Sequence, residues 1–309
     1  MFNIVLSLLL LSVLVEAKML QRTKVLMGTF VTLSLNAQDK HHFKPSFKLL
    51  KSIEASLSSY DLNATVYRLN RDKIVKADFY TYDAMRLAKK YYRVSDGYFN
   101  IAIGSVTKNL YHFGEDEQIP SLNALQKSRV LFKGIYFDKD ILKIDKNIKI
   151  DFGGMGKGYG VDRVTEYLKQ HHILNATIAL SGDIRCLGAC SIDIQDPFSQ
   201  GIVVSLKSIA DEMAFSTSGS YNRYVETQEH NHLINPKTKE SQQNFLSITL
   251  ISKLPNSDLD AFATAASVMP IQMAYHFLNK KNLAYIIMEK NSHMFVSENI
   301  ELFVTYTKK

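Results

Sequence analysis

The densest glycine cluster of the chain, DFGGMGKGYG at residues 151–160, constrains the fold more than any other feature. It follows an alternating apolar segment at 141–150, which predicts a strand, and precedes a helical apolar period through Val161, Val164 and Leu168. Backbone N–H groups in such a connection can receive a pyrophosphate, and glycine lets a ligand approach the main chain. A tight structural turn accounts for the same cluster without any ligand.

The two common phosphate-binding motifs do not fit this cluster. A Walker motif requires Ser or Thr after its Lys, but Gly158 follows Lys157, and Asp151 stands where the first glycine belongs. The glycines are also too closely spaced for a Rossmann fingerprint. Phosphate binding and a structural turn therefore both remain open from the cluster alone.

A second segment, SDLDAFATAASVM at residues 257–269, places Asp260 and Thr264 four residues apart. On a helix this spacing puts both oxygen-bearing side chains on one face. A carboxylate and a hydroxyl are hard ligands that suit Mg2+, and the surrounding alanines let a bulky ligand come close. The alternative is an ordinary alanine-rich packed helix whose Asp favours the positive end of the helix dipole.

The chain begins with an apolar stretch from Ile4 to Val15, followed by Glu16 and Ala17. This pattern predicts a Sec-type signal peptide at residues 1–17 and a mature periplasmic chain from residue 18, since a permanent span needs about 20 apolar residues. The alternatives are an uncleaved N-terminal anchor and a merely hydrophobic strand. No cysteine follows the stretch, which argues against a lipid-anchored precursor.

The only two cysteines, Cys186 and Cys190, lie within RCLGAC. A tight turn could bring them within bonding distance in an oxidising compartment, and two small buried residues beside a turn are an equally good interpretation. This spacing gives little support to a zinc site.

With 309 residues, of which 46% are hydrophobic, the chain can bury a substantial core. We find no internal repeat and no Pro/Gly-rich linker, so residues 18–309 are expected to form a single domain. The formal net charge of +7 suits a phosphate-bearing ligand or an acidic partner. Nucleic acid is not expected, because the Lys and Arg residues are scattered and no recognition motif is present.

Helical periods and mostly short alternating strands follow one another along the chain, which predicts an α+β fold. The expected helices lie at about 47–57 and 82–94 and after the glycine cluster. The expected strands lie at 24–35, with an interruption at 28–29, and at 141–150, 176–180, 191–194, 201–206, 247–251, 283–288 and 300–305.

Three polar segments, SGDIR, STSGSYNRY and HNHLINPKT, are rich in residues that form hydrogen bonds or transfer protons, although each could be an ordinary loop. The last of them contains His232.

Taken in order, MGTFVTL, SSYD, DGYFN, LYHFG, DFGGMGKGYGVD, SGDIR, IQDP, STSGSYNRY, HLINP and DAFATA resemble the motif series of the ApbE-type FAD:protein FMN transferases. The resemblance extends from Met27 to Met269. It implies an α+β fold with mixed, largely antiparallel sheets, flanking helices and two intertwined lobes that hold FAD between them.

The resemblance also implies where the ligands lie. A Mg2+ ion would be held by Asp260, Thr264 and the carbonyl of Gly156. The residues expected to bind FAD are Met27, Tyr60, Tyr98, Phe99, Asn100, Gly153, Lys157, Leu233 and Ile234.

The implied reaction transfers the FMN half of FAD to a Thr or Ser hydroxyl of an acceptor protein and releases AMP. Lys157 and Mg2+ would neutralise the charge of the leaving phosphate, and His232 would act as the general base, because imidazole titrates in the required range. The expected acceptor carries an FMN-binding domain and belongs to an exported or membrane redox complex, with this chain peripheral to the membrane at most.

Two other activities are compatible with the same residues: an FAD pyrophosphatase that releases FMN and AMP, and a non-catalytic exported flavin-binding protein.

Three positions depart from the family pattern. Asn100 and Asn235 replace the usual Asp residues, which removes a charge at each position, and Gly156 replaces the common Ala, which leaves a carbonyl ligand intact.

Overall fold

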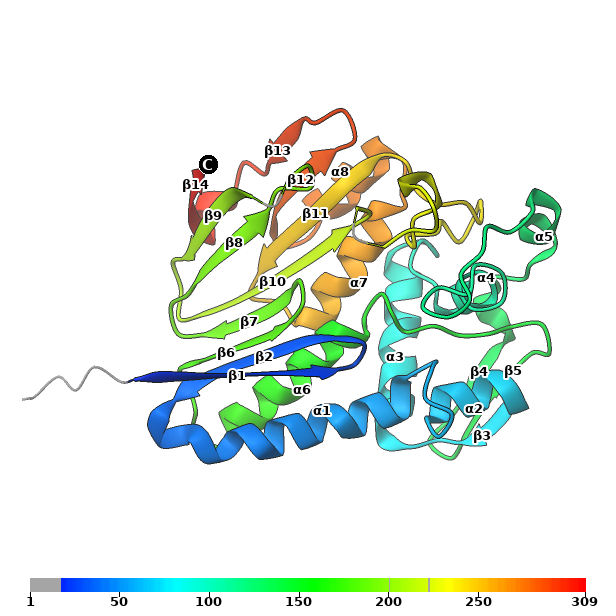
Figure 1. Cartoon of the computed structure of the whole chain (residues 1–309), viewed down its shortest axis with the longest axis horizontal. Coiled ribbons are helices and arrows are strands. Elements are labelled where there is room, and N and C mark those ends of the chain that lie inside the picture. The colour runs from blue at the N-terminus through cyan, green and yellow to red at the C-terminus, as the bar shows by residue number, and fades with distance from the viewer. Residues whose placement is uncertain (1–17, 200, 222) are drawn as a thin grey trace, which may run out of the picture.

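The computed structural model describes residues 18–199, 201–221 and 223–309 (Figure 1). The signal peptide predicted at residues 1–17 lies outside the described residues. Within the described ranges, no helix has both the length and the apolar character needed to cross a bilayer.

The main sheet has eight described strands, and every neighbouring pair in it is antiparallel. In spatial order they are β1 (Met19–Leu26), β2 (Thr29–Asn36), β6 (Ala176–Leu180), β7 (Asp183–Leu187), β10 (Glu212–Gly219), β11 (Phe245–Ser252), β12 (Ala284–Glu289) and β13 (Met294–Val296).

Two smaller antiparallel sheets accompany it. One consists of β14 (Val304–Lys308), β9 (Ile202–Ser208) and β8 (Ser191–Gln195), and the other of β3 (Ile74–Lys76), β5 (Ile141–Ile144) and β4 (Ile135–Phe137).

The helices lie between these strands along the chain. They are α1 (Phe43–Leu57), α2 (Thr65–Asp72), α3 (Phe79–Val94), α4 (Gly104–Thr107), α5 (Leu122–Lys127), α6 (Gly156–Gln170), α7 (Asn256–Ser267) and α8 (Ile271–Asn279). Short 3-10 turns occur at Ala37–His42, Ile101–Ile103, Phe132–Gly134, Gln228–His230 and Ile300–Leu302. The expected α+β class with largely antiparallel sheets is confirmed.

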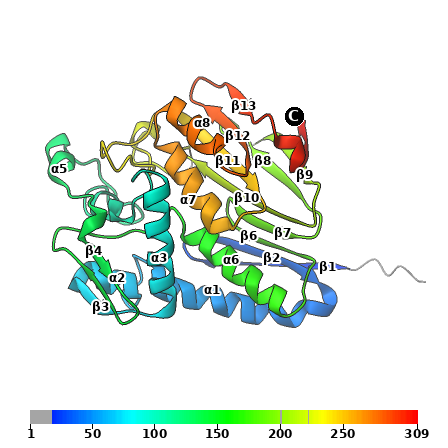
Figure 2. The ribbon, with the colours of Figure 1, turned by 180° about the vertical axis from the view of Figure 1, so that it is seen from behind.

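The main sheet is covered on both faces, because neighbouring residues on a strand point to opposite sides. Ala214 of β10 and Leu250 of β11 belong to the core under the helices, and Figure 2 shows α1, α6 and α7 across that face. Phe215 and Ile251, one position further along each strand, belong to a second core. That second core is shared with the small sheet of β8, β9 and β14.

A second lobe is built from α2 to α5 and the small sheet β3–β5, at the right of Figure 1. It has a small core of its own, which contains Val106, Tyr111 and Phe113. The core under the main sheet also extends into this lobe through residues of α2 and α3, such as Leu69 and Met85. Burying each large apolar side chain stabilises the fold by roughly 1.5–3 kcal/mol, so the shared core holds the two lobes together.

Helix α7 lies in the interior, and Thr264 is its one residue that is not buried. The alanine-rich sequence explains this position, because small side chains let the helix lie close to α6 and to the sheet. Both interpretations of this segment in the sequence assumed a helix, and the structure has one there.

Several element boundaries differ from the predicted ones. The expected interrupted strand at 24–35 is a hairpin of β1 and β2 that turns at Met27 and Gly28, both of which have positive φ. Strands β7 and β10 were not predicted, because Asp183 and Arg185 interrupt the apolar residues of β7 and the second half of β10 is STSG. The strand expected at 141–150 ends at Ile144, and the one expected at 300–305 begins only at Val304.

Candidate active site

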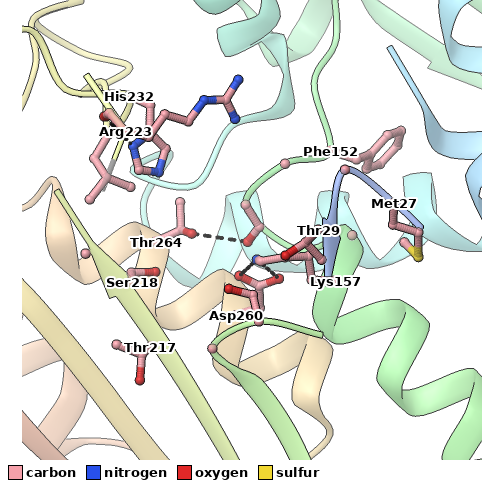
Figure 3. Close-up of a pocket in the computed structure, with 18 of the residues that line it drawn as sticks. Met27, Thr29, Phe152, Lys157, Thr217, Ser218, Arg223, His232, Asp260 and Thr264 are labelled. Carbon is pink, nitrogen blue, oxygen red and sulfur yellow. Dashed lines mark hydrogen bonds and ion pairs between the residues drawn. The ribbon is translucent and has the colours of Figure 1, made fainter. Parts of the chain in front are cut away.

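A large cavity of about 1310 Å³ lies between the two lobes. This volume exceeds the roughly 300–1,000 Å³ of most small-molecule pockets, so a dinucleotide-sized ligand can be accommodated. Most of the residues predicted for the site line it, and Figure 3 shows the cavity at close range. They are Met27, Tyr60, Gly153, Gly156, Lys157, His232, Leu233, Ile234, Asp260 and Thr264.

The glycine cluster brings α6 against α7. A Cβ atom on Gly158 would lie 2.3 Å from the backbone oxygen of Asn256, so only glycine permits this approach. The close contact places the backbone N–H of Gly158 3.1 Å from Asp260 Oδ2, to which it donates a hydrogen bond. The cluster therefore has a structural role as well as a place in the cavity wall.

Four side chains form what we call the carboxylate pole: Lys157, Asp260 and Thr264 line the cavity, and Asp183 is buried behind the wall in contact with Lys157. Lys157 Nζ lies 2.9 Å from Asp183 Oδ2 and 3.2 Å from Asp260 Oδ2 (Figure 3 shows the contact with Asp260). Burial by itself would lower the pKa of Lys157, but the two carboxylates outweigh it and raise the pKa above its ordinary value. Lys157 therefore stays positively charged at neutral pH.

Asp183 is the member of this pole that we did not predict. Its side chain is fully buried and accepts a 2.6 Å hydrogen bond from Ser216 Oγ. Burial and the neighbouring Asp260 raise the pKa of Asp183 to about 7, against the opposing effect of Lys157. SGDIR was interpreted as a polar segment, and its Asp and Arg residues gave no sequence signal that Asp183 begins a buried strand.

The oxygen atoms of the carboxylate pole fit a magnesium ion. Asp260 contributes a carboxylate, and Thr264 Oγ1 donates a 3.2 Å hydrogen bond to the carbonyl oxygen of Gly154, so carboxylate, hydroxyl and carbonyl oxygens gather here. The ammonium of Lys157 already provides Asp260 with a positive charge. Within residues 18–309, apart from the two undescribed positions, no cluster of three His, Cys, Asp or Glu residues could hold a metal. Mg2+ commonly binds through one or two carboxylates together with substrate phosphates and water, which is the set available here.

The carbonyl expected to reach this ion is that of Gly156, which is the first residue of α6. The carbonyl that Thr264 contacts is instead that of Gly154. Both glycines line the cavity, so Gly156 remains a predicted ligand and Gly154 is a second nearby carbonyl.

A second group, which we call the cationic rim, consists of Tyr60, Lys108, Asp151 and Arg223. The hydroxyl of Tyr60 donates a 2.8 Å hydrogen bond to the Phe113 carbonyl and accepts hydrogen bonds from Lys108 and from Arg223, the latter at 2.9 Å. Lys108 Nζ also lies 3.7 Å from Asp151.

The cationic rim is positively charged. Burial by itself would raise the pKa of Asp151, but Lys108, the backbone N–H of Gly153 and Arg223 hold that pKa below its ordinary value. Asp151 is therefore ionised, and its single negative charge faces the two positive charges of Lys108 and Arg223. The two groups thus differ in composition, with two carboxyl groups around one ammonium at the carboxylate pole and one carboxylate beside two cations at the rim.

His232 lies beside the cationic rim. Its Nδ1 is 3.1 Å from the carbonyl oxygen of Arg223, and because a carbonyl only accepts, Nδ1 carries the proton. The neutral ring therefore has its lone pair on Nε2. Burial and the nearby Arg223 guanidinium lower the pKa of His232 to about 4, well below the near-neutral range expected from the sequence.

Three predicted flavin contacts do not line the cavity. Tyr98, Phe99 and Asn100 are buried, and none of them is among the cavity-lining residues. The Phe99 ring packs edge to face on Tyr91, and Asn100 Oδ1 accepts a 3.0 Å hydrogen bond from the Ala102 N–H. The structure thus assigns these residues to packing between α3 and the following turn, behind the cavity wall.

The two Asn residues that depart from the family pattern both use their amide group as a donor. Asn100 Nδ2 donates to the Val130 carbonyl at 3.3 Å, and Asn235 Nδ2 donates to the Val268 carbonyl at 2.9 Å. A carboxylate could not form either bond. Asn235 therefore ties the loop after His232 to the end of α7, and it does not line the main cavity.

The two cysteines form a disulfide, which settles the alternatives left open by the sequence. Cys186 lies in β7 of the main sheet, and Cys190 immediately precedes β8 of the small sheet. Residues 192–195 of β8 line the cavity, so the bond fastens one cavity wall to the main sheet.

Fold and site together define an enzyme with a cavity for a large phosphate-bearing substrate, whose wall carries a pole suited to a divalent cation, a cationic rim and a neutral histidine. The sequence matches the ApbE family model over residues 27–287, and the chain therefore belongs to the ApbE family.

The chain is similar to FAD:protein FMN transferases from two bacteria. It is 24% identical to the one from Klebsiella pneumoniae (strain 342), covering 88% of this chain and 90% of that protein. It is 26% identical to the one from Haemophilus influenzae, covering 84% and 82%, respectively.

Solved structures confirm the fold. The ApbE protein of Thermotoga maritima superposes with a TM-score of 0.84 at 22% identity, covering 93% of this chain and 99% of that one. The flavin transferase ApbE of Vibrio cholerae gives a TM-score of 0.80 at 20% identity, with the same two coverages.

Proposed function

We propose that the chain is an FAD:protein FMN transferase, which moves the FMN half of FAD to a Thr or Ser hydroxyl of an acceptor protein and releases AMP. The observation that supports this most directly is that one large cavity carries the carboxylate pole, the cationic rim and a neutral His232 in the same wall. The names of the relatives agree with this activity.

FAD would lie along the cavity between the lobes. Its pyrophosphate would be placed at the carboxylate pole, and its isoalloxazine ring would contact Met27 at the hairpin turn, the loop at Tyr60, and Leu233 with Ile234. The apolar side chains of the last two residues offer a surface for the flavin ring.

Asp260 and Thr264, with a carbonyl of the glycine cluster, would hold Mg2+ against the pyrophosphate. When bound, this ion would supply Lewis-acid stabilisation of the phosphate charge. Lys157 supplies a second positive charge from the chain itself, because Asp183 and Asp260 keep its ammonium protonated.

His232 would accept the proton of the acceptor hydroxyl at Nε2. The hydroxyl oxygen forms a new bond to the FMN phosphorus, the bridging P–O bond of the pyrophosphate breaks, and AMP leaves with the electron pair of that bond. With a pKa near 4 the imidazole is neutral and ready to accept a proton, but it is a weak base. An anionic ligand beside Arg223 would offset the guanidinium charge and raise that pKa towards the useful range.

Water could take the place of the acceptor hydroxyl, which would make the chain an FAD pyrophosphatase. The observation in favour of this second activity is the exposure of the rim, where Tyr60 is 41% exposed. An acceptor protein that covers the rim would exclude this water, so we expect hydrolysis to be a side reaction.

The disulfide supports the proposal that the protein works in an oxidising compartment, which for a chain with a Sec-type leader is the periplasm. We propose an acceptor with an FMN-binding domain in an exported or membrane redox complex, reached from a chain that is peripheral to the membrane at most.

The experiment is intact-protein mass spectrometry of an FMN-binding-domain acceptor after incubation with residues 18–309, FAD and Mg2+. A gain of one FMN that disappears with EDTA, and with a Thr→Ala change in the acceptor, is expected. Free FMN and AMP without acceptor labelling would assign the chain as a hydrolase, and bound FAD without turnover would assign it as a binding protein.

A further inference from the structure

The start of α7 lacks a cap of its own. Helices leave their first backbone N–H groups without intrahelical partners, and a Ser, Thr, Asp or Asn at the N-cap usually accepts from them. The N-cap residue of α7 is Pro255, and it makes no side-chain cap hydrogen bond. These N–H groups are buried, so they need a partner from elsewhere in the chain.

Asp162 of α6 is that partner. Its Oδ1 accepts a 2.7 Å hydrogen bond from the backbone N–H of Asn256, and its Oδ2 accepts a 2.9 Å bond from that of Ser257. One buried carboxylate thus caps a helix that begins 94 residues later in the sequence.

Two further residues hold the same point. Arg185 donates a 2.7 Å hydrogen bond to the Leu254 carbonyl, just before α7, and lies 3.7 Å from Asp162. The side chain of Asn256 donates to the carbonyls of Ile184 and Phe215, at 3.0 and 3.1 Å. The first turn of α7 is therefore attached both to α6 and to the sheet.

This attachment lies one turn before Asp260. Asp162 does not line the cavity and cannot touch a ligand there. It does fix the position of α7 along its axis relative to α6. This position determines the distance of Asp260 from Lys157 and from the Gly158 N–H. Because Thr264 is one turn further along the same rigid helix, it moves together with Asp260.

We propose that Asp162 is a positioning residue for the divalent cation, which acts by capping α7 and thereby fixing Asp260 and Thr264 relative to α6. The inference rests on the proposed cation site but not on the identity of the acceptor. Loss of the cap lets the start of α7 shift, and the two ligands then no longer meet the ion together.

The test uses residues 18–309 with FAD and measures Mn2+ binding by electron paramagnetic resonance, since Mn2+ is a spectroscopic substitute for Mg2+. Asp162→Asn keeps the size of the side chain but turns one acceptor into a donor that faces an N–H. We expect the Mn2+ dissociation constant to rise about 10-fold to 100-fold, as is typical when the support of a metal ligand is lost. The affinity for FAD in EDTA, measured by flavin fluorescence, should change less than about twofold, because Asp162 does not contact FAD.

Asp78→Ala is the matched control. Asp78 caps α3 by accepting a 2.9 Å hydrogen bond from the Thr81 N–H, and it is also absent from the cavity wall. This variant should lose stability to heat but keep the wild-type affinity for Mn2+. Asp162→Glu, which keeps the charge but displaces it, is the second variant if Asp162→Asn does not fold, and it should also weaken Mn2+ binding.

Unchanged Mn2+ affinity in the folded Asp162 variants, with only a lower melting temperature, would refute the positioning role. So would Mn2+ binding in the wild type that survives Asp260→Ala. If the wild type binds Mn2+ through Asp260 but labels no acceptor, the proposed transferase function fails while the role of Asp162 stands.

Discussion

The carboxylate pole and the cationic rim are built in different ways. The carboxylate pole comes from the interior of two helices and a central strand, and its Asp183 is fully buried. The cationic rim comes mainly from loops, and its Tyr60 and Arg223 are exposed. The pole is held by hydrogen bonds between α6 and α7, whereas the rim is held by three hydrogen bonds on a single tyrosine hydroxyl.

This difference indicates a division of labour. A cation and a pyrophosphate need fixed geometry, which rigid helices provide, whereas an acceptor protein has to enter and leave, which loops permit. Changes at the pole should therefore abolish chemistry, and changes at the rim should alter rate and pH dependence.

The largest effect should follow Asp260→Ala, which removes the only carboxylate of α7 that faces the cation. We expect FMN transfer at saturating FAD to fall by about 10³-fold or more, because phosphate charge is then poorly stabilised. The measurement is the rate of acceptor labelling by mass spectrometry across a range of Mg2+ concentrations. The control is Asp193→Ala, which removes a cavity carboxylate on β8 that belongs to neither the pole nor the rim. Its labelling rate should stay within about threefold of wild type. Full activity of the Asp260 variant at limiting Mg2+ would refute the proposal that the carboxylate pole holds the cation.

A smaller loss should follow His232→Ala. Removing a general base typically slows the chemical step by about 10²-fold to 10³-fold, while FAD affinity should change little, because a base acts in the transition state. Single-turnover labelling measures the first quantity and flavin fluorescence the second. His230→Ala, two residues away and outside the cavity wall, should behave as wild type. Equal losses in rate and affinity would instead assign His232 to flavin positioning.

The hydrogen bond that ties the loop after His232 to the end of α7 should be measurable through Asn235→Asp. The change replaces the donor to the Val268 carbonyl with a charged acceptor, near the negative end of the α7 dipole. We expect the free energy of unfolding in urea to fall by about 2 kcal/mol, the cost of a lost and unsatisfied hydrogen bond. The exposed Asn63, changed to Asp, is the control. A variant as stable as wild type would mean that the loop is held without this bond.

The smallest effect should be a change in titration in Arg223→Gln. The pKa of the folded His232, about 4, lies below the unfolded value of 6.5 because of burial and then Arg223, so removing the guanidinium should raise it by up to about one unit. NMR of labelled histidine measures this shift directly. A His232 pKa that stays near 4 would show that burial, and not the Arg223 guanidinium, is the main cause of the shift.

The sign of the linked stability follows from the same pKa values. Above pH 6.5 the imidazole is neutral in both the folded and the unfolded chain, and the stabilisation due to this group is fully present. It is lost as the pH falls from 6.5 towards 4, because only the unfolded chain then takes up the proton. The Arg223→Gln variant should therefore lose less stability over that window.

Sequence patterns predicted the pole better than the rim, and the reason is locality. Asp260 and Thr264 are four residues apart on one helix, so a local period finds both, and Lys157 lies in a conspicuous glycine cluster. Lys108 and Arg223 meet at Tyr60 only through tertiary packing, and no local pattern encodes that meeting. Asp183 was missed for a related reason. Its strand is buried because other elements cover it, and the composition of the strand itself does not reveal this.

The helical pole also has a consequence for the order in which the protein becomes active. The Gly158 N–H and the Asp260 carboxylate that it contacts are 102 residues apart in the chain. Contacts at such a separation form late in folding, because a long loop must be closed first. A nascent chain therefore carries the glycine cluster without its partner helix. Its carboxylate pole is incomplete until the segment that forms α7 has been synthesised and has packed against α6.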